Sequence, residues 1–355
     1  MNQGIFLLIF LAVVLTLLLL DLGVFHKDDH VVTFKEAAGW TCVWVLLAIA
    51  FGVFILLTGE LIHGVHTQEQ LIAIDQLHGH ELKFDWEQGL EYNIKLYRKA
   101  MAMEYFTGYL VEESLSIDNI FVMIMIFMSF GVEKKYYHRV LFYGILGAIV
   151  LRFTFIFAAG ALIQRFHWIL FVFGVVLIYT GIKMFVDRNK KETIDVANHP
   201  VVKFLSKRNL STSEFHGHDF FVKQDGRWLL TPLFVVLLII EFSDIIFAFD
   251  SIPAIFSITQ DQYIVFFSNI FAIMGLRSLF FMLESVMDKF AYLKIGLSVL
   301  LTFIGVKMLL PLVGVHVGTF ASMIVIIGIL VSSVVLSLLF PPKQIMNETQ
   351  PVENE

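Results

Sequence analysis

The chain has 355 residues, of which 58% are hydrophobic and only 16% charged, and its mean hydropathy is +0.79. One soluble core cannot hide so much apolar surface, so the composition excludes an ordinary soluble domain and predicts an all-α, polytopic membrane protein. The net charge of −6 is modest and gives no reason to expect a nucleic-acid partner. The single cysteine, Cys42, excludes a disulfide framework within the chain.

Nine segments are apolar over about 20 residues, the length that crosses the hydrocarbon of a bilayer. The first has no Lys or Arg before it and no small-residue cleavage site, so we expect a retained helix rather than a signal peptide. The predicted spans are Ile5–Phe25, Gly39–Thr58, Tyr105–Gly131, Tyr136–Ile163, His167–Val186, Leu229–Ile258, Tyr263–Met287, Tyr292–Val313 and Val317–Phe340.

Lys and Arg are distributed unevenly between alternate loops. Sixteen fall after spans one, three, five and seven and in the C-terminal tail. Because cytoplasmic loops carry the excess of positive charge, we expect the N-terminus outside and the C-terminus in the cytoplasm. The opposite side holds five, namely Lys83, Lys95, Arg98, Lys99 and Arg165. The basic cluster directly before the third span is the one feature that argues against this orientation.

Two of the predicted spans contain carboxylates at matching spacing. In each, an acid is followed six residues later by Asp, then by a small polar residue and then by Ile. A charge in the middle of a membrane helix costs roughly 2.5–3.5 kcal/mol, so such acids are candidates for a functional site. These residues are Glu112, Asp118 and Asn119 in the third span, and Asp244, Asp250 and Ser251 in the sixth.

Four basic residues within the spans repeat in the same order. In the first unit, a Leu-Arg pair that contains Arg152 precedes the motif G-I-K-M that contains Lys183. In the second unit, a Leu-Arg pair that contains Arg277 precedes G-V-K-M, which contains Lys307, at nearly the same separation in sequence. Each unit of three spans therefore contains two acids, then Leu-Arg, then Gly-x-Lys-Met, which indicates an internal duplication. Because three is odd, the two units enter the membrane from opposite sides and form inverted three-helix repeats.

The predicted organisation has five parts. Residues 1–100 hold two N-terminal spans and an external loop, 101–187 the first repeat, 188–228 a cytoplasmic loop, 229–313 the second repeat, and 314–355 the last span and a cytoplasmic tail. The alternating pattern F-F-V-K-Q-D-G-R-W-L-L-T predicts a hairpin around Asp225-Gly226. That loop is too small for a catalytic domain, and the chain has no Gly-rich phosphate loop, so we expect no enzyme and no use of ATP.

The arrangement of the acids predicts a cation site between the repeats. Inverted repeats place the substrate near the midplane, often on interrupted helices, and Pro253 should kink the sixth span and free the Phe249 carbonyl. Carboxylate and carbonyl oxygens suit hard divalent cations. On a continuous helix Glu112 and Asp118 would point about 120° apart, so the helix must bend or the ion must lie between repeats.

The number of charges leaves several alternatives open. Four carboxylates exceed the charge of one divalent ion, so some are protonated, or paired with the basic residues, or occupied in turn. Arg152, Lys183, Arg277 and Lys307 are predicted to be structural or gating partners. In the structural alternative, the whole set forms ion pairs that only hold the bundle together. Weaker site candidates are Glu113 and Glu241, which lack a counterpart in the other repeat, and Asp21 near a helix end.

Histidines in the loops offer a second place for a metal. His63, His66, His78 and His80 fall in the external loop, and His216 and His218 in the cytoplasmic one. Neutral imidazoles bind transition metals, but their spacing here matches no tight zinc signature, and loop histidines are usually solvated.

The chain resembles the TerC family of integral membrane proteins, most closely its Alx branch. The motifs that carry the resemblance are E-E-S-L-S-I-D-N-I-F-V, the L-R and G-I-K-M pair, and E-F-S-D-I-I-F-A-F-D-S-I-P-A-I-F-S-I-T, supported by D-L-G-V-F-H near Asp21 and D-G-R-W-L-L-T-P before the sixth span. The resemblance implies manganese export across the bacterial inner membrane, with links to tellurite resistance and alkaline pH. It assigns the acidic motif to the six residues named above, and the adjacent Glu113 leaves open which glutamate faces the pathway.

The predicted function is a secondary transporter that exports Mn²⁺ or another hard divalent cation, with protons as the economical counter-ion because buried carboxylates titrate. The alternative is a membrane scaffold or assembly factor that transports nothing. The expected partners are the transported cation and the lipid bilayer, with no resident cofactor; protein partners and oligomeric state stay open.

Overall fold

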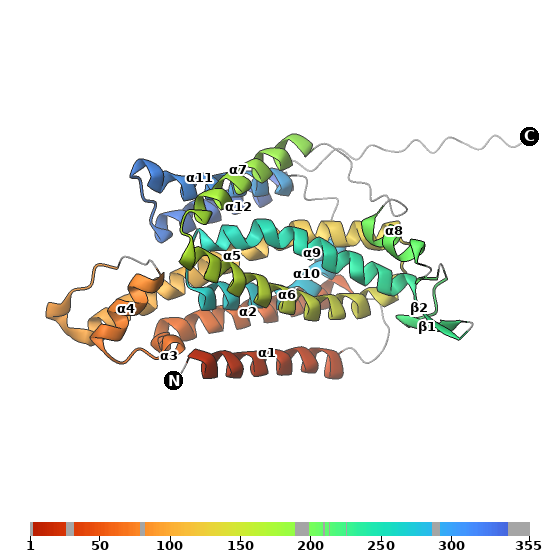
Figure 1. The fold of residues 1–355 in the computed structure, drawn as a ribbon, viewed down its shortest axis with the longest axis horizontal. Coiled ribbons are helices and arrows are strands. Elements are labelled where there is room, and N and C mark those ends of the chain that lie inside the picture. Colours follow the sequence, from red (N-terminus) through yellow and green to blue (C-terminus); the bar gives the residue numbers. More distant parts are fainter. Residues whose placement is uncertain are drawn as a thin grey trace, which may run out of the picture.

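The computed structural model describes residues 3–25, 32–78, 82–188, 199–208, 210–212, 214–224, 226–285 and 292–339. Within them, long helices lie side by side in an elongated bundle (Figure 1). The long helices are α1 Gln3–Phe25, α2 Phe34–Thr58, α5 Gly89–Ser129, α6 Tyr137–Arg165, α7 Ile169–Asp187, α9 Pro232–Phe256, α10 Gln262–Glu284, α11 Leu293–Leu309 and α12 Thr319–Leu339. The short elements are α3 Glu60–His63, α4 Gln68–His78, η1 Trp86–Gln88, η2 Lys134–Tyr136, α8 Pro200–Lys207, β1 Phe221–Gln224, β2 Arg227–Leu230 and η4 Leu310–Val313.

Eight helices of the described chain, all the long ones except α5, are long and apolar enough to cross a membrane, against nine predicted spans. This confirms a mostly helical, polytopic protein. The predicted third span lies within α5, a helix of 41 residues that begins at Gly89 instead of Tyr105. The N-terminal part of α5 is charged, so its sequence predicts a loop. Arg98 in this part pairs with Glu60 of α3 at 2.5 Å, and this ion pair holds the extension of α5 against the neighbouring short helix.

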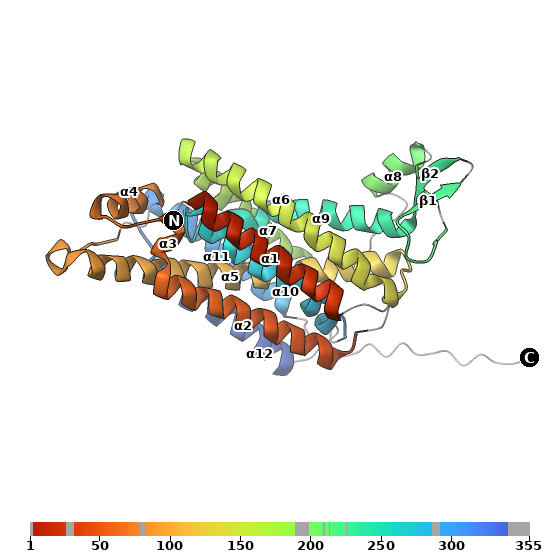
Figure 2. The same ribbon diagram turned by 90° about the horizontal axis from the view of Figure 1, so that it is seen from below.

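The two helices that carry the acidic motifs run in opposite directions. Helices α3 and α4 lie at one end of the bundle, and α8, β1 and β2 lie at the other (Figures 1 and 2). Helix α5 runs from the α4 end toward the hairpin, where its residues Ile120–Phe127 share a core with Phe220 and Leu233. Helix α9 follows the hairpin directly and runs back. The opposed directions are those of an inverted repeat.

Packing between the two sets of three helices is reciprocal. Helix α5 packs on α10 while α6 packs on α9, so the first helix of each set contacts the second helix of the other. The third helices, α7 and α11, pack extensively on one another. This pattern is expected when α5–α7 and α9–α11 are related by a pseudo-two-fold axis, as in transporters with inverted repeats. The five sequence parts themselves remain a prediction.

Glycines bring α7 and α11 into close contact. A Cβ added to Gly305 would lie 2.6 Å from the carbonyl oxygen of Gly174, and one added to Gly181 would lie 2.7 Å from the carbonyl oxygen of Ser298. Gly181 and Gly305 are the glycines of the repeated Gly-x-Lys-Met motif. The motif glycine therefore permits the backbones to approach, as small residues do in membrane helix pairs.

Aromatic side chains attach the N-terminal helices to the repeats. Phe10 of α1 packs on Phe267 of α10 with ring centroids 4.4 Å apart, and Phe51 of α2 packs on Phe271 at 5.0 Å. The Tyr105 hydroxyl of α5 donates to the Ala48 carbonyl of α2. Helices α1 and α2 thus cover α10, most of whose residues are buried.

The predicted hairpin is confirmed, and both motif helices are continuous, which favours the alternative that the ion lies between the repeats; the kink expected at Pro253 stays a prediction. Strands β1 and β2 pair antiparallel, and Gly226 adopts the positive φ of 78° that the turn requires. Both α5 and α9 continue without a break through their acidic motifs, and α9 passes through Pro253 to Phe256. Pro253 has no N–H to donate to the Phe249 carbonyl, and because it lies in the last turn only three helical residues follow it.

Candidate functional site

The side chain of Arg152 lies at the centre of a polar cluster within the bundle. Its Nη1 is 2.5 Å from Glu112 Oε1 of α5 and donates to Ser251 Oγ of α9 at 2.8 Å and to Asn269 Oδ1 of α10 at 2.6 Å. Its Nη2 lies 3.6 Å from Asp244 Oδ1 of α9. Arg152 itself is on α6, so four helices from both repeats contribute to what we call the Arg152 cluster.

Every member of the Arg152 cluster is buried. Arg152 is 1% exposed and Glu112 0%, and Asp244 is 6% exposed. Charges are kept in such surroundings only when they are paired and hydrogen-bonded. One guanidinium faces two carboxylates, and Asp244 Oδ2 is buried without a hydrogen bond to any described residue. The cluster therefore keeps oxygen atoms that could still bind a cation.

Residues that the sequence predicted from both repeats meet in this cluster. Glu112 and Asp244 are the first acids of the two motifs, and Ser251 is the small polar residue of the second. Arg152 was among the expected partners. Asn269 was missed, because it has no counterpart in the other repeat; a lone amide within the apolar run F-F-S-N-I-F is the signal that could have found it.

The second acids of the motifs lie elsewhere. Asp250 accepts a hydrogen bond of 3.0 Å from the Thr180 hydroxyl of α7, on the helix that also carries Lys183. Asp118 is half-buried on α5, directly before the buried Asn119. On continuous helices two residues six apart diverge by about 120°, which is why the motif acids do not all converge.

The weaker acidic candidates occupy different positions. Glu113 faces Gly275 of α10. Of the two adjacent glutamates, Glu112 is the one that pairs with Arg152. The Glu241 carboxylate lies against the bare backbone of Gly147 on α6, where a methyl group would overlap it. Asp21 belongs to the last part of α1, and its side chain lies outside what the structure describes.

The other basic candidates have partners of different kinds. Arg277 is buried, and its Nη1 lies 3.0 Å from His138 Nε2 of α6. Lys307 borders a cavity of about 280 Å³ that Glu104 and His316 also line. Among the ion pairs of the described residues, those with motif acids are therefore made by Arg152.

The Arg152 cluster is closed in this conformation. The adjacent cavity, which Asp244 and Glu241 border, measures about 10 Å³. That is close to the smallest space that holds one water molecule, so a hydrated ion does not fit. Access from either side therefore requires helices α5, α6, α9 and α10 to move.

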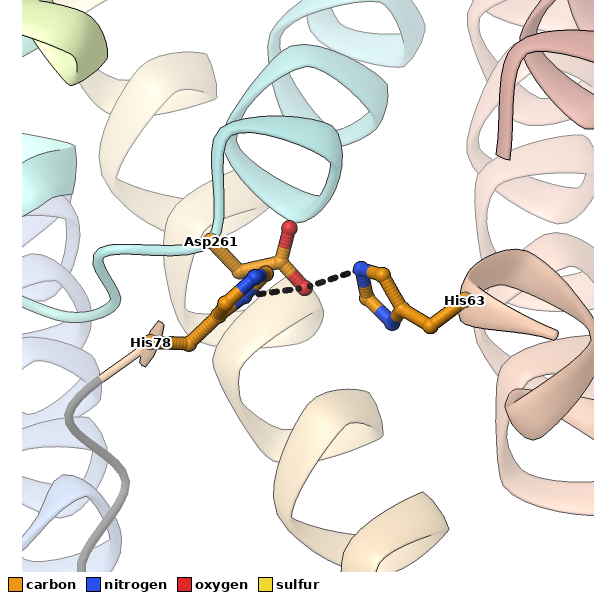
Figure 3. A group of neighbouring side chains, drawn as sticks. All are labelled: His63, His78 and Asp261. Carbon is orange, nitrogen blue, oxygen red and sulfur yellow. Dashed lines mark ion pairs between the residues drawn. The ribbon is translucent and has the colours of Figure 1, made fainter. Parts of the chain in front are cut away.

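Two of the loop histidines meet at the end of the bundle that carries α3 and α4. His63 Nε2 and His78 Nδ1 each lie 3.2 Å from Oδ2 of Asp261, the residue before α10 (Figure 3). Burial raises the pKa of Asp261, but His63 and His78 outweigh it and hold that pKa well below its usual value. His66 is exposed, and His80 lies outside the described residues.

A bundle of apolar helices with buried ion pairs between inverted sets defines a polytopic membrane protein of the kind that includes transporters. The family model described as "Integral membrane protein TerC family" matches residues 97–344, so the chain belongs to the TerC family.

Named relatives cover nearly the whole chain. An uncharacterized membrane protein of Myxococcus xanthus is 46% identical over 331 residues, 93% of this chain and 91% of its own length. Alx of Escherichia coli K12, whose name presents it as a proposed membrane-bound redox modulator, is 38% identical over 329 residues, 92% of each chain. Alx of Photorhabdus laumondii is 40% identical over 85% of this chain and 84% of its own. No solved structure matches the chain.

Proposed function

We propose that this TerC-family protein exports Mn²⁺, or another hard divalent cation, across the bacterial cytoplasmic membrane. One observation carries the proposal: the first acids of both repeats, Glu112 and Asp244, meet at Arg152 in a buried cluster between the repeats. Transporters with inverted repeats bind their substrate at this kind of position. Oxygen ligands of this type suit Mn²⁺ and similar ions.

In the proposed mechanism Arg152 and the transported ion alternate. Without an ion, the guanidinium balances part of the charge of Glu112 and Asp244. When the helices open, a divalent cation takes its place between the carboxylates, with the hydroxyl of Ser251 and the amide oxygen of Asn269 as neutral ligands. Two carboxylates balance one divalent ion fully, so exchange of the guanidinium for the ion keeps the buried charge small.

In the proposed pathway, the second acids of the two motifs bind the ion on either side of the Arg152 cluster. Asp118 follows Glu112 by six residues toward the hairpin end, and Asp250 follows Asp244 by six residues toward the α3 end. Six residues of helix span about 9 Å. We assign Asp118, with Asn119, to the approach from the cytoplasm and Asp250 to the exit, with Glu113, Glu241 and Asp21 as lesser contributors.

The direction of export rests on the proposed orientation. The loop between α7 and α9 carries the largest excess of Lys and Arg, which supports a cytoplasmic hairpin and an external N-terminus. Protons moving inward are the proposed counter-ions, because buried carboxylates that release a metal can take up a proton.

The relatives named Alx are described as redox modulators. The single cysteine of this chain does not favour a redox function based on a disulfide. With Cys42 alone, the chain cannot form an internal disulfide. A second candidate function, a membrane scaffold or assembly factor, is favoured by the Arg152 cluster itself, because buried pairs of this kind also hold helices together.

Expression in a manganese-sensitive bacterium that lacks its exporters tests the proposal. The wild-type chain should lower cellular manganese and restore growth in high manganese. Glu112→Gln should do neither while it accumulates normally in the membrane. Unchanged manganese content with the wild-type chain inserted in the membrane would leave the scaffold as the better-supported function.

A further inference from the structure

Three metal-binding side chains converge at the α3 end of the bundle, away from the Arg152 cluster. His63 ends α3, His78 ends α4, and Asp261 precedes α10. One nitrogen of each histidine and one oxygen of Asp261 lie within 4.8 Å of one another, and all three residues are buried. Figure 3 shows both imidazole rings directed at the same carboxylate oxygen.

One carboxylate oxygen serves both histidines. His63 Nε2 and His78 Nδ1 each lie 3.2 Å from Asp261 Oδ2, and the side chains of His63 and Asp261 are 0% exposed. Ion pairs with Asp261 account for this approach when the imidazoles are protonated. When the imidazoles are neutral, the same three atoms are a donor set for a divalent cation.

Two of the three distances between the ligand atoms are close to those of a first-row transition-metal site, and the third is at most 4.8 Å. First-row transition-metal ions bind imidazole nitrogen and carboxylate oxygen at about 2.0–2.2 Å, so neighbouring ligands of a tetrahedral site lie about 3.4 Å apart. The two nitrogen-to-oxygen distances here are 3.2 Å. Two histidines and one carboxylate leave a coordination position open, as in sites that exchange a ligand.

Other contacts hold the donor atoms in place. The Tyr97 hydroxyl lies 2.9 Å from His63 Nδ1, and in the tautomer where Nδ1–H donates to it, the Nε2 lone pair faces Asp261. Asp261 Oδ1 accepts from the backbone N–H of Tyr263 and Ile264 and caps α10, which leaves Oδ2 toward the histidines. Partners of this kind orient metal ligands and raise affinity.

We propose that His63, His78 and Asp261 bind one divalent first-row transition-metal ion. The ion joins α3 and α4 to the start of α10 at the end of the bundle that faces outward in the proposed orientation. The cavity of about 280 Å³ that His78 and Glu104 line lies beside the site and provides room for a water ligand or an arriving ion.

Cobalt and zinc binding to the purified, full-length chain in detergent, stripped first with a chelator, tests this proposal. Co²⁺ should produce visible d–d absorption that Zn²⁺ removes, and Zn²⁺ should raise the melting temperature. Asp261→Asn keeps a good helix cap but loses the negative ligand. It should bind one ion fewer per chain and lose both the absorption and the thermal shift.

Matched variants distinguish binding at these three residues from binding elsewhere on the chain. His66→Ala alters an exposed histidine of the same segment and should behave as wild type. Tyr97→Phe keeps all three ligands and should bind about 10-fold or more weakly. Glu112→Gln should retain the cobalt absorption even if transport is lost, so this proposal and the transport proposal fail separately.

Equal binding and equal thermal shifts in wild type and Asp261→Asn would overturn the site. If Asp261→Asn does not accumulate, His63→Gln replaces it as the ligand variant, and cobalt absorption of wild-type strength in that variant would overturn the site equally. Absence of any cobalt absorption from the folded wild-type chain would show the three residues to be an ion-pair cluster without metal.

Discussion

The two partners of the Glu112–Arg152 ion pair differ in what their loss leaves behind. Arg152→Gln leaves two buried carboxylates close together, and an unpaired buried charge costs about 3–5 kcal/mol, so this variant should be depleted from the membrane. Glu112→Gln leaves Arg152 paired with Asp244 and should accumulate almost as wild type. Quantitative immunoblotting of membranes measures both.

Arg165→Gln is the control for these variants, because Arg165 is exposed at the end of α6 and its loss should not change abundance. Wild-type abundance of Arg152→Gln would show that the guanidinium does not hold the carboxylates, and the exchange mechanism would lose its basis.

At the level of single residues, the sequence predicted those that are duplicated. The shared spacing identified Glu112, Asp244 and Ser251, and the structure brings them together. Asn269 and Asp261 could not be found in that way, because neither has a counterpart in the other repeat. The meeting of His63 with His78 depends on two short helices and a distant loop, which no local spacing encodes.

Among the helices, the close contact of α7 with α11 makes Gly305 sensitive to substitution. Gly305→Ala places a methyl group 2.6 Å from the Gly174 carbonyl oxygen, and overpacking of this kind costs about 1–3 kcal/mol. The melting temperature of the purified protein should fall. Gly328→Ala on α12 is the matched control, because nothing lies within 4 Å of its new methyl group and alanine favours a helix.

A melting temperature of Gly305→Ala equal to that of Gly328→Ala would contradict the packing of α7 on α11.

Helix positions were predicted well where apolar residues define them and poorly where charges intervene. The apolar runs predicted α6, α7 and α10 closely, whereas Lys95, Arg98 and Lys99 concealed the first turns of α5. Propensity and backbone hydrogen bonding continue a helix past the membrane boundary, but hydropathy alone does not record it. Helix α9 continues past Pro253 to Phe256, so the proline in the sequence does not by itself mark the end of the helix.

For the whole molecule, α3 and α4 lie at the end opposite the hairpin (Figure 1), and the excess of Lys and Arg is the basis for proposing that the hairpin end faces the cytoplasm. In a Cys42→Ala background, His66→Cys should react with a membrane-impermeant maleimide in intact cells, and His218→Cys only after the cells are opened. The reverse pattern would invert the orientation and turn the proposed export into import.

Reporter fusions at three residues outside the described parts of the chain test the same orientation. Fusions at Lys190 and Glu355 should give cytoplasmic signals, and a fusion at His80 should give an external signal.

Carboxylates of both repeats carry the cation in the proposed transport cycle. Manganese uptake into inside-out membrane vesicles, normalised to the amount of inserted protein, tests this role most directly, because export from the cell becomes uptake into such vesicles. Asp118→Asn and Asp250→Asn keep the size of the side chain and one oxygen but remove the charge that a divalent ion needs. Glu133→Gln, at an exposed acid, is the control. We expect uptake by the wild type and the control and none by either Asn variant at normal abundance; full uptake by both Asn variants would contradict the proposed role of these carboxylates.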